Sequence, residues 1–416
     1  MPGSGRARPG RKNLTEGPTG ALDARGPVPD ERRRSIVRFL FVVGGGSAPV
    51  HASVPLAWAA RAAGHEVLVA SPEENLDLVT GLGLPARGVT DLGMGDAMLK
   101  DRQGNWLPMP TSESTEMDFA GRGFARLSAA SYQGTEELAE AWRPDVVIGG
   151  EYNHAAPLIA HKFSIPLVSH TWAIYDRTDI DWQGATDELK PELAAFGLDA
   201  IPEPALFVDI TPPTVRPGHA EPAQPMRWAP GNPQIALEPW MYAKGDRPRV
   251  VITSGSRSVF IPALGLDFFR PLLGGSVLGG GDVEVIVAAP EPVAAQLRAE
   301  FPDVRAGFVP LDVVAPTADL VLHHGGGVTV MTLLNAGTPQ LVLPEILASA
   351  IPMRPVDEFG ASITLPSHTV PVEDTEAAVS KILGDTSYRA KAGELAAEIA
   401  SMPSQAEVVK VIEGLV

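Results

Sequence analysis

Three glycine-rich turns stand out in this chain of 416 residues, because each follows an apolar run with the composition of a buried strand. They are Gly44-Gly45-Gly46-Ser47, Ser254-Gly255-Ser256-Arg257 and His323-His324-Gly325-Gly326-Gly327-Val328-Thr329. The backbone N–H groups of such turns can approach a phosphate, and a helix N-terminus that follows favours negative charge. None of the three matches a Walker P-loop or the dinucleotide fingerprint in full. A tight structural turn explains the first one equally well.

The third turn gives the strongest indication of a ligand site. His323 and His324 place imidazole groups ahead of three glycines at a predicted helix start, and Thr329 falls in the first turn of that helix. This combination predicts a site that holds phosphate groups. Arg257, at the end of the second turn, could add a fixed positive charge to such a site. A solvated loop arginine explains Arg257 equally well.

Alternating strand and helix patterns must position these turns. The run Val37 to Val43 predicts a buried strand, Pro55 to Ala63 a helix and Glu66 to Ala70 a second strand, which together form a βαβ unit of a parallel sheet. Open α/β sheets bind ligands at the carboxyl ends of their strands, where the glycine turns fall. Further strands are predicted at 145–148, 166–169, 249–253, 283–288, 319–322 and 340–343, and helices at 136–142, 155–163, 387–400 and 406–415.

The length of the chain favours two domains, because one hydrophobic core rarely grows to this size. Frequent prolines between Leu206 and Asp246 indicate a passage between the two domains. Two doubly wound domains leave a cleft between them, which is the usual place for a ligand. We expect a disordered Gly-, Pro- and Arg-rich tail at 1–36, an N-terminal domain at 37–228, a linker at 229–247, a C-terminal domain at 248–396 and a final helix at 397–416 that crosses back to the first domain.

Composition narrows the class of function. A formal net charge of −17 argues against nucleic acid, whose phosphates require a basic face, and against an anionic membrane surface. The absence of cysteine rules out disulfides, thiolate metal sites and a cysteine nucleophile. No apolar run is long enough to span a bilayer, and no apolar segment follows the N-terminal arginines as in a secretion signal. A cytoplasmic enzyme that acts on small molecules fits these properties.

Several segments carry a resemblance to a known family. The segment from Pro55 to Val67 resembles the opening helix of bacterial GT-B glycosyltransferases that modify antibiotics. The stretch from Val309-Pro310-Leu311 through His323-His324-Gly325-Gly326 to Ala336-Gly337-Thr338-Pro339-Gln340 resembles their donor-binding signature. Segments 117–121, 206–210, 237–242 and 253–257 are most similar to transferases of angucycline-type aromatic polyketides, such as the urdamycin and landomycin enzymes. The resemblance extends from Val37 to the end of the chain.

The resemblance implies a GT-B fold, with two Rossmann-like doubly wound domains that face an interdomain cleft. It also implies inverting transfer of a deoxysugar from a dTDP-sugar to an aromatic polyketide in antibiotic biosynthesis, without metal or other cofactor. Phe308 matches a position where the family often has an aromatic residue that stacks on the nucleobase, although a buried strand-end aromatic fits equally well. The implied donor-binding residues are Ser254, Gly255, Ser256, Arg257, Phe308, Val309, His323, His324, Gly325, Gly326, Gly327 and Thr329.

The acceptor would lie on the N-terminal domain. The segment from Asp91 to Arg122 has few structural signals and several large apolar side chains, which suits a mobile wall against a flat acceptor. Ordinary core contacts from a long loop are the alternative. The expected acceptor-binding residues are Trp106, Phe119, Trp172 and Ala173.

This chain departs from the family at three places. Many relatives have a catalytic histidine where this chain has Pro49, with His51 close by in the same predicted loop. Carbon-glycosylating relatives carry an aspartate where this chain has Ala173, so transfer to oxygen is favoured and transfer to carbon is left open. The segment after Pro344 is also more apolar than the polar pair common in relatives, which suits a highly deoxygenated sugar or a weakened donor site.

A base must come within hydrogen-bond reach of the proton that it removes. The candidates are His51, Asp176 and Glu151, followed by His170 and His154, which packing or surface roles explain better. A surface role for His51 and a helix-capping role for Asp176 are the competing interpretations. Two other functions stay open: a non-catalytic homologue that is the partner of another transferase, and a nucleotide-sugar epimerase. The sequence does not decide the sugar, the acceptor or whether a homodimer forms.

Overall fold

The structure, a computed structural model, describes residues 36–175, 177–255 and 264–416. Three of the predicted site residues, Asp176, Ser256 and Arg257, lie outside the described residues, as does the predicted N-terminal tail up to Ser35.

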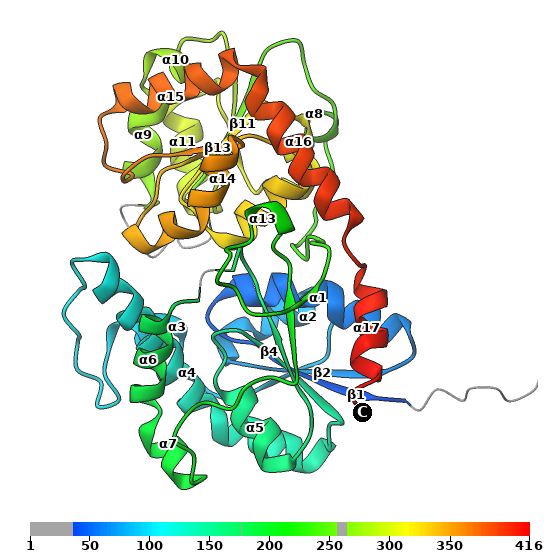
Figure 1. Cartoon of the computed structure of the whole chain (residues 1–416). Helices are drawn as coiled ribbons and strands as arrows, with labels where there is room; N and C mark the ends of the chain where they lie inside the picture. The colour runs from blue at the N-terminus through cyan, green and yellow to red at the C-terminus, as the bar shows by residue number, and fades with distance from the viewer. Residues whose placement is uncertain (1–35, 176, 256–263) are drawn as a thin grey trace, which may run out of the picture. The chain divides into compact units, whose positions relative to one another are not determined.

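The first sheet has seven parallel strands in the order β3-β2-β1-β4-β5-β6-β7 (Figure 1). The strand order reverses beside β1, which pairs with β2 on one side and with β4 on the other. Such a reversal is the point at which open α/β sheets bind ligands. The strands are β1 Arg38–Val42, β2 Glu66–Ser71, β3 Ala86–Gly88, β4 Val146–Gly150, β5 Leu167–His170, β6 Leu206–Asp209 and β7 Gln224–Pro225.

The second sheet has six parallel strands in the order β10-β9-β8-β11-β12-β13, and its order reverses beside β8. The two parallel sheets confirm the predicted fold class of two Rossmann-like units. Strands β10 and β13 were not predicted. The strands are β8 Arg249–Thr253, β9 Glu284–Ala288, β10 Arg305–Gly307, β11 Leu320–His323, β12 Gln340–Val342 and β13 Ser362–Thr364.

Helices cover both faces of the first sheet because its strands are apolar on both sides. Phe39 and Phe41 of β1 pack with Val54 of α1 (Ser47–Ala62). Leu40 and Val42 of β1 point to the other face, where they pack with α4 (Glu113–Trp142) and α5 (Ala155–Phe163). This alternation is the strand period of two. The other helices before the second sheet are α2 Leu76–Gly81, α3 Met94–Leu99, α6 Asp179–Glu188, α7 Lys190–Ala195 and α8 Pro239–Tyr242.

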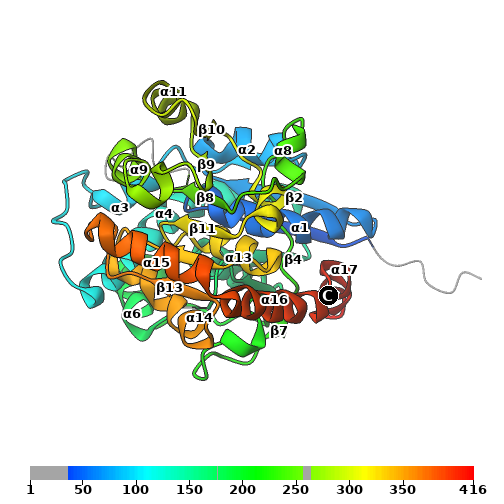
Figure 2. The same cartoon turned by 90° about the horizontal axis from the view of Figure 1, so that it is seen from above.

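The second half of the chain ends in two consecutive helices, α16 (Thr386–Ser401) and α17 (Gln405–Glu413), which Figures 1 and 2 show leading to the C-terminus. Helix α17 packs on the first unit, since Ile412 belongs to the same buried cluster as Val54, and Glu413 Oε1 lies 2.8 Å from His65 Nε2. In the described part of the chain, no helix has the length and apolar character needed to cross a membrane. The remaining helices are α9 Leu266–Leu273, α10 Ser276–Gly279, α11 Glu291–Glu300, α12 Leu311–Val314, α13 Gly327–Ala336, α14 Arg354–Phe359 and α15 Val372–Gly384.

Two predictions about local structure are wrong. Helix α1 begins at Ser47 and not at Pro55, so His51 lies in a helix and not in a loop. Within this helix the His51 carbonyl receives no hydrogen bond from residue 55, because Pro55 has no N–H. Gly231 packs against the same carbonyl, and a Cβ on Gly231 would lie 2.2 Å from its oxygen. The segment 91–122, expected to be a loop, contains α3 and the first third of α4.

Candidate functional site

His323 shapes the third glycine turn from inside the protein. Its side chain is fully buried, Nδ1 accepts a hydrogen bond from the Gly325 backbone N–H at 3.1 Å, and Nε2 lies 2.9 Å from Gln340 Oε1. Because Nδ1 is the acceptor, Nε2 carries the proton and donates it to Gln340. Burial lowers the pKa of His323 to about 4, so the ring is neutral near pH 7. In this structure the His323 imidazole is thus turned into the protein, and its part in donor binding stays a prediction.

His324 lies where the second and third glycine turns meet, because β8 and β11 are neighbouring strands. A Cβ on Gly255 would lie 2.6 Å from the His324 ring, and one on Gly326 would lie 2.8 Å from it. Two glycines are thus required for the backbone to approach this ring so closely. The structure brings together residues that the sequence placed in two separate turns.

Helix α13 begins directly after this turn. Gly325 has a φ of 90°, a conformation that favours glycine, and Gly327 is the first residue of the helix. No described side chain caps α13, and its first turn contains no acidic residue. The backbone N–H groups of the first turn therefore keep their capacity for an anion, and the partly exposed Thr329 lies beside them.

The other predicted donor residues divide by exposure. Phe308 follows β10 and exposes 49% of its surface, so the alternative of a buried aromatic is wrong. Val309 beside it is buried. Ser254 is also buried, and its hydroxyl donates to the Leu264 carbonyl at 2.5 Å.

Three aromatic rings form a cluster in the first unit. The Phe124 and Tyr152 rings stack with centroids 5.1 Å apart and 22° between their planes, and the Trp172 centroid lies 5.4 Å from Phe124 and 5.6 Å from Tyr152. Gly45 touches the cluster, since a Cβ on it would lie 2.6 Å from Phe124. The cluster therefore lies at the carboxyl ends of β1, β4 and β5. We call Phe124, Tyr152 and Trp172 the aromatic wall.

Of the predicted acceptor residues, only Trp172 belongs to the aromatic wall. Phe119 lies on α4 and is partly exposed, while Trp106 is 71% exposed with its ring beneath the Lys100 ammonium at 5.0 Å. Sequence reasoning missed Phe124 and Tyr152. Tyr152 had a usable signal, because it stands two residues after the strand end Gly149-Gly150.

The aromatic wall meets the third glycine turn at a contact between two small residues. A Cβ on Gly327 would lie 2.4 Å from the Ala173 Cβ and 3.6 Å from the Trp172 carbonyl oxygen. Ala173 is buried by this contact and has little surface to offer a ligand. The start of α13 and the aromatic wall are thus adjacent parts of one site.

The candidate bases differ in their surroundings. Burial lowers the pKa of His51 to about 4, so its imidazole is neutral near pH 7, and no described group bonds to its buried Nε2. His154 and His170 are almost fully buried, and burial lowers their pKa values to about 3 and 4. Glu151 is buried at the end of β4, where its N–H donates to the His170 carbonyl at 3.2 Å.

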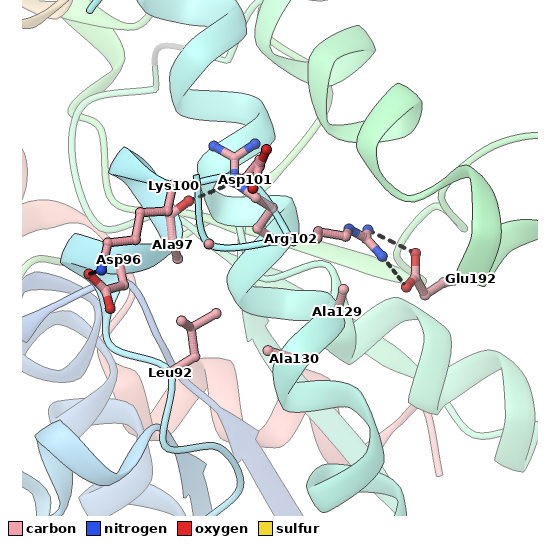
Figure 3. A pocket seen from close by; sticks show the side chains of 11 residues that line it. Leu92, Asp96, Ala97, Lys100, Asp101, Arg102, Ala129, Ala130 and Glu192 are labelled. Atoms are coloured by element: carbon pink, nitrogen blue, oxygen red, sulfur yellow. Dashed lines mark hydrogen bonds and ion pairs between the residues drawn. The ribbon is translucent and has the colours of Figure 1, made fainter. Parts of the chain in front are cut away.

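A separate cavity of about 460 Å³ lies between α3 and α4 (Figure 3). None of its lining residues belongs to the glycine turns or to the aromatic wall. Four of its charged side chains pair with one another, Lys100 with Asp96 at 2.8 Å and Arg102 with Glu192 at 2.6 Å, and Arg126 pairs with Glu188 at 3.1 Å. Such pairing gives no reason to expect a charged ligand there.

Two parallel Rossmann-like units, with glycine turns at their strand ends and a helix N-terminus suited to phosphate, are the architecture of the GT-B class. Residues 112–255 match the model of the erythromycin biosynthesis protein CIII-like N-terminal domain, and residues 275–415 match that of the C-terminal domain. The L-demethylnoviosyl transferase of Streptomyces niveus is 34% identical over 364 residues, which cover 87% of this chain and 93% of that protein. The chain belongs to the erythromycin biosynthesis protein CIII-like family of antibiotic glycosyltransferases.

Solved structures agree with this membership. Glycosyltransferase SsfS6 from Streptomyces sp. SF2575, complexed with thymidine diphosphate, matches with a TM-score of 0.78 and 33% identity over 91% of this chain and 99% of that chain. Spinosyn rhamnosyltransferase SpnG, complexed with spinosyn aglycone, matches with a TM-score of 0.78 and 28% identity over 91% of this chain and all of that chain. The predicted resemblance to antibiotic glycosyltransferases is confirmed.

Proposed function

We propose that this enzyme moves a deoxysugar from a dTDP-sugar to a hydroxyl group of an aromatic polyketide, with inversion at the anomeric carbon. The observation that carries the proposal is the contact of Gly327 with Ala173 beside Trp172. This contact joins a helix start suited to a diphosphate to a wall of aromatic rings suited to a flat acceptor. A donor and an acceptor bound at these two places would be neighbours.

The donor half of the proposal rests on three groups. The first turn of α13 and the His324 ring would hold the diphosphate, and the exposed Phe308 ring would stack on the thymine base. The complex of SsfS6 with thymidine diphosphate supports this choice of nucleotide. The segment Ile346 to Ala350 follows β12, and Ser349 of this segment lies against Gly325. Its apolar composition suits a sugar with few hydroxyl groups.

The chemical step would be a single displacement. The acceptor oxygen forms a bond to the anomeric carbon while the bond from that carbon to the diphosphate oxygen breaks, and dTDP leaves. His51 would take the proton of the acceptor hydroxyl, because its imidazole is neutral at the pH of the reaction and no described group bonds to its Nε2. Its lowered pKa makes it a weak base, which suits an acidic phenol hydroxyl. The N-terminus of α13 would stabilise the negative charge that the leaving diphosphate gains. Transfer to oxygen is favoured because Ala173 carries no carboxylate.

The test is transfer by the purified chain alone, with dTDP-deoxysugars and hydroxylated aromatic acceptors, read by product mass and by its stability in acid. His51→Ala should lower kcat by about a hundredfold or more, the usual contribution of a positioned base, and leave the Kd for dTDP unchanged. His161→Ala is the matched control, because His161 is exposed on α5. Full activity of His51→Ala would move the base role to another residue.

The same assay separates the alternatives. A chain that binds dTDP but transfers nothing until a second transferase is added would support the partner hypothesis, which Pro49 in place of the common histidine motivates. Release of a rearranged sugar nucleotide without any acceptor would support an epimerase. A homodimer stays a prediction that the assay does not address and that sedimentation would decide.

A further inference from the structure

Tyr152, the buried member of the aromatic wall, is held by a carboxylate that the sequence did not single out. The Tyr152 hydroxyl donates to Asp181 Oδ2 at 3.1 Å, and Asp181 exposes only 4% of its surface. Asp181 also closes the capping box of α6, where it accepts from the Thr178 backbone N–H at 3.1 Å. One carboxylate thus fixes the start of a helix and the ring of a tyrosine.

Close backbone packing sets the position of Asp181. Helix α4 crosses α6 at two glycines, and a Cβ on Gly121 would lie 2.0 Å from the Asp181 carbonyl oxygen. A Cβ on Gly184 would lie 2.8 Å from Asp118 Oδ1. Helices approach this closely only where side chains are absent, so the crossing leaves little freedom to slide. Phe124 lies one turn after Gly121 on the same helix, and its ring stacks on the Tyr152 ring.

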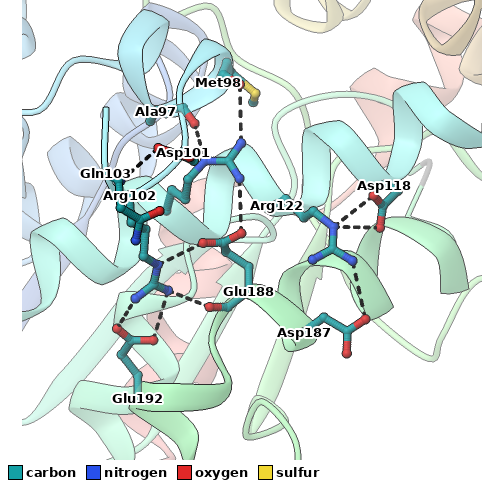
Figure 4. A network of polar contacts seen from close by, with 11 residues as sticks. Ala97, Met98, Asp101, Arg102, Gln103, Asp118, Arg122, Asp187, Glu188 and Glu192 are labelled. Atoms are coloured by element: carbon teal, nitrogen blue, oxygen red, sulfur yellow. Dashed lines mark hydrogen bonds and ion pairs between the residues drawn. The ribbon is translucent and has the colours of Figure 1, made fainter. Parts of the chain in front are cut away.

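Ion pairs reinforce the crossing (Figure 4). Arg122 of α4 binds Asp118 at 2.9 Å and reaches Asp187 of α6 at 3.5 Å. The nearly buried Arg126 binds Glu188 of α6 at 3.1 Å and donates to the Ala97 carbonyl at 2.7 Å. Charged pairs with one buried partner constrain geometry more than exposed pairs do. Asp181 therefore lies at a helix crossing that close backbone packing and ion pairs both hold in place.

We propose that Asp181 is a positioning residue for the acceptor: it holds Tyr152, and Tyr152 sets the positions of the Phe124 and Trp172 rings that receive a flat aromatic ligand. Both of these rings are partly exposed, whereas Tyr152 lies behind them and touches each. A tyrosine freed from Asp181 would let the two rings change their relative tilt. The identity of the ligand as the sugar acceptor rests on the proposed function.

Three variants test this role. Tyr152→Phe removes only the hydroxyl, and Asp181→Asn keeps an oxygen that can cap α6 while it weakens the bond to Tyr152. Tyr132→Phe is the matched control, because the Tyr132 hydroxyl also binds a carboxylate, Glu136, on the same helix but outside the aromatic wall. All three conserve volume, and melting temperatures show whether each variant is folded.

The readouts are the Kd for 1,8-dihydroxyanthraquinone, followed by quenching of tryptophan fluorescence, the acceptor KM and kcat of transfer, and the Kd for dTDP. Tyr152→Phe should raise the anthraquinone Kd and the acceptor KM about tenfold, the effect of about one hydrogen bond, with the Kd for dTDP and kcat within twofold of wild type. Asp181→Asn should change the same quantities in the same direction. Tyr132→Phe should change none of them.

The proposal is overturned if Tyr152→Phe and Asp181→Asn behave like Tyr132→Phe. It is also overturned if they lower kcat and dTDP affinity together with acceptor affinity, because that result indicates a general loss of structure in the protein. Anthraquinone binding requires no donor. If wild type binds the anthraquinone but neither binds dTDP nor transfers a sugar, the proposed function fails while the role of Asp181 is still measured. If wild type transfers the sugar and the variants match the control, only the role of Asp181 fails.

Discussion

Removal of the fully buried His323 ring should weaken dTDP binding through the turn that the ring holds in place. His323→Ala leaves the Gly325 N–H without its acceptor and Gln340 Oε1 without its donor, both in a fully buried place. A buried polar group left without a partner costs about 1–3 kcal/mol. If the turn loses about 1.5–3 kcal/mol of its preference for the binding conformation, dTDP affinity falls about ten- to a hundredfold, since 1.4 kcal/mol is a factor of ten.

Calorimetric titration with dTDP measures this change. Gln340→Leu is the informative companion, because it removes the bond to Nε2 and leaves the bond from Gly325 to Nδ1 in place. We expect Gln340→Leu to lower the melting temperature and to change dTDP affinity by less than about threefold, a difference below 1 kcal/mol. An unchanged affinity in His323→Ala would refute the reasoning. Equal losses in both variants would assign the effect to strand packing and not to the turn.

Three further results are expected. Phe308→Ala should weaken dTDP binding about tenfold and leave pyrophosphate binding unchanged in the same titration, because base stacking is worth about 1–3 kcal/mol; equal losses for both ligands would exclude stacking. Ala173→Leu should lower kcat/KM at least tenfold and Ala173→Gly should not, because added atoms at Gly327 force the two elements apart. The free energy of unfolding in urea should fall from pH 7.5 to pH 5, since a folded-state His154 pKa of about 3 lies below the unfolded value of 6.5 and the stability present above pH 6.5 is lost on acidification. His154 alone should contribute about 2 kcal/mol of that fall, and a His154→Gln variant with the same pH dependence as wild type would contradict this assignment.

The predicted fold was correct where strands are long and central. β1, β2, β8 and β9 are uninterrupted apolar runs, because helices cover both faces of a parallel sheet. β10 and β13, two of the strands that sequence reasoning missed, have three residues at the sheet edge and are only partly buried, so no apolar run marks them. About the first three quarters of α4 were missed because its glycines lower helix propensity, while the structure uses them for close contact with Asp181 and Val89.

The site was predictable to the level of turns but not of individual roles. The glycine turns that follow apolar strands correctly marked the places where the backbone comes close to His324. The position of glycine after a strand was enough to find them. The roles of His323 and His324 could not be separated from the sequence, because adjacent residues at a strand end point to opposite sides and both side chains are buried. Only their contacts separate them: His323 bonds to Gly325 and Gln340, whereas the His324 ring lies against Gly255 and Gly326. Asp181 and Tyr152 are 29 residues apart, and only the fold brings them within hydrogen-bond distance.

Two small residues, Gly327 and Ala173, set the distance between the start of α13 and the aromatic wall. Gly327 begins the helix that would hold the leaving diphosphate, and Ala173 follows the ring that would face the acceptor, and the two are in van der Waals contact. Any longer side chain at either position would separate the helix start from the aromatic wall, and an attacking oxygen can react only if it is held near the bond that breaks. The alanine that replaces the aspartate of carbon-glycosylating relatives therefore does more than remove a carboxylate. It also leaves room for the start of α13, because a longer side chain at this position would meet Gly327.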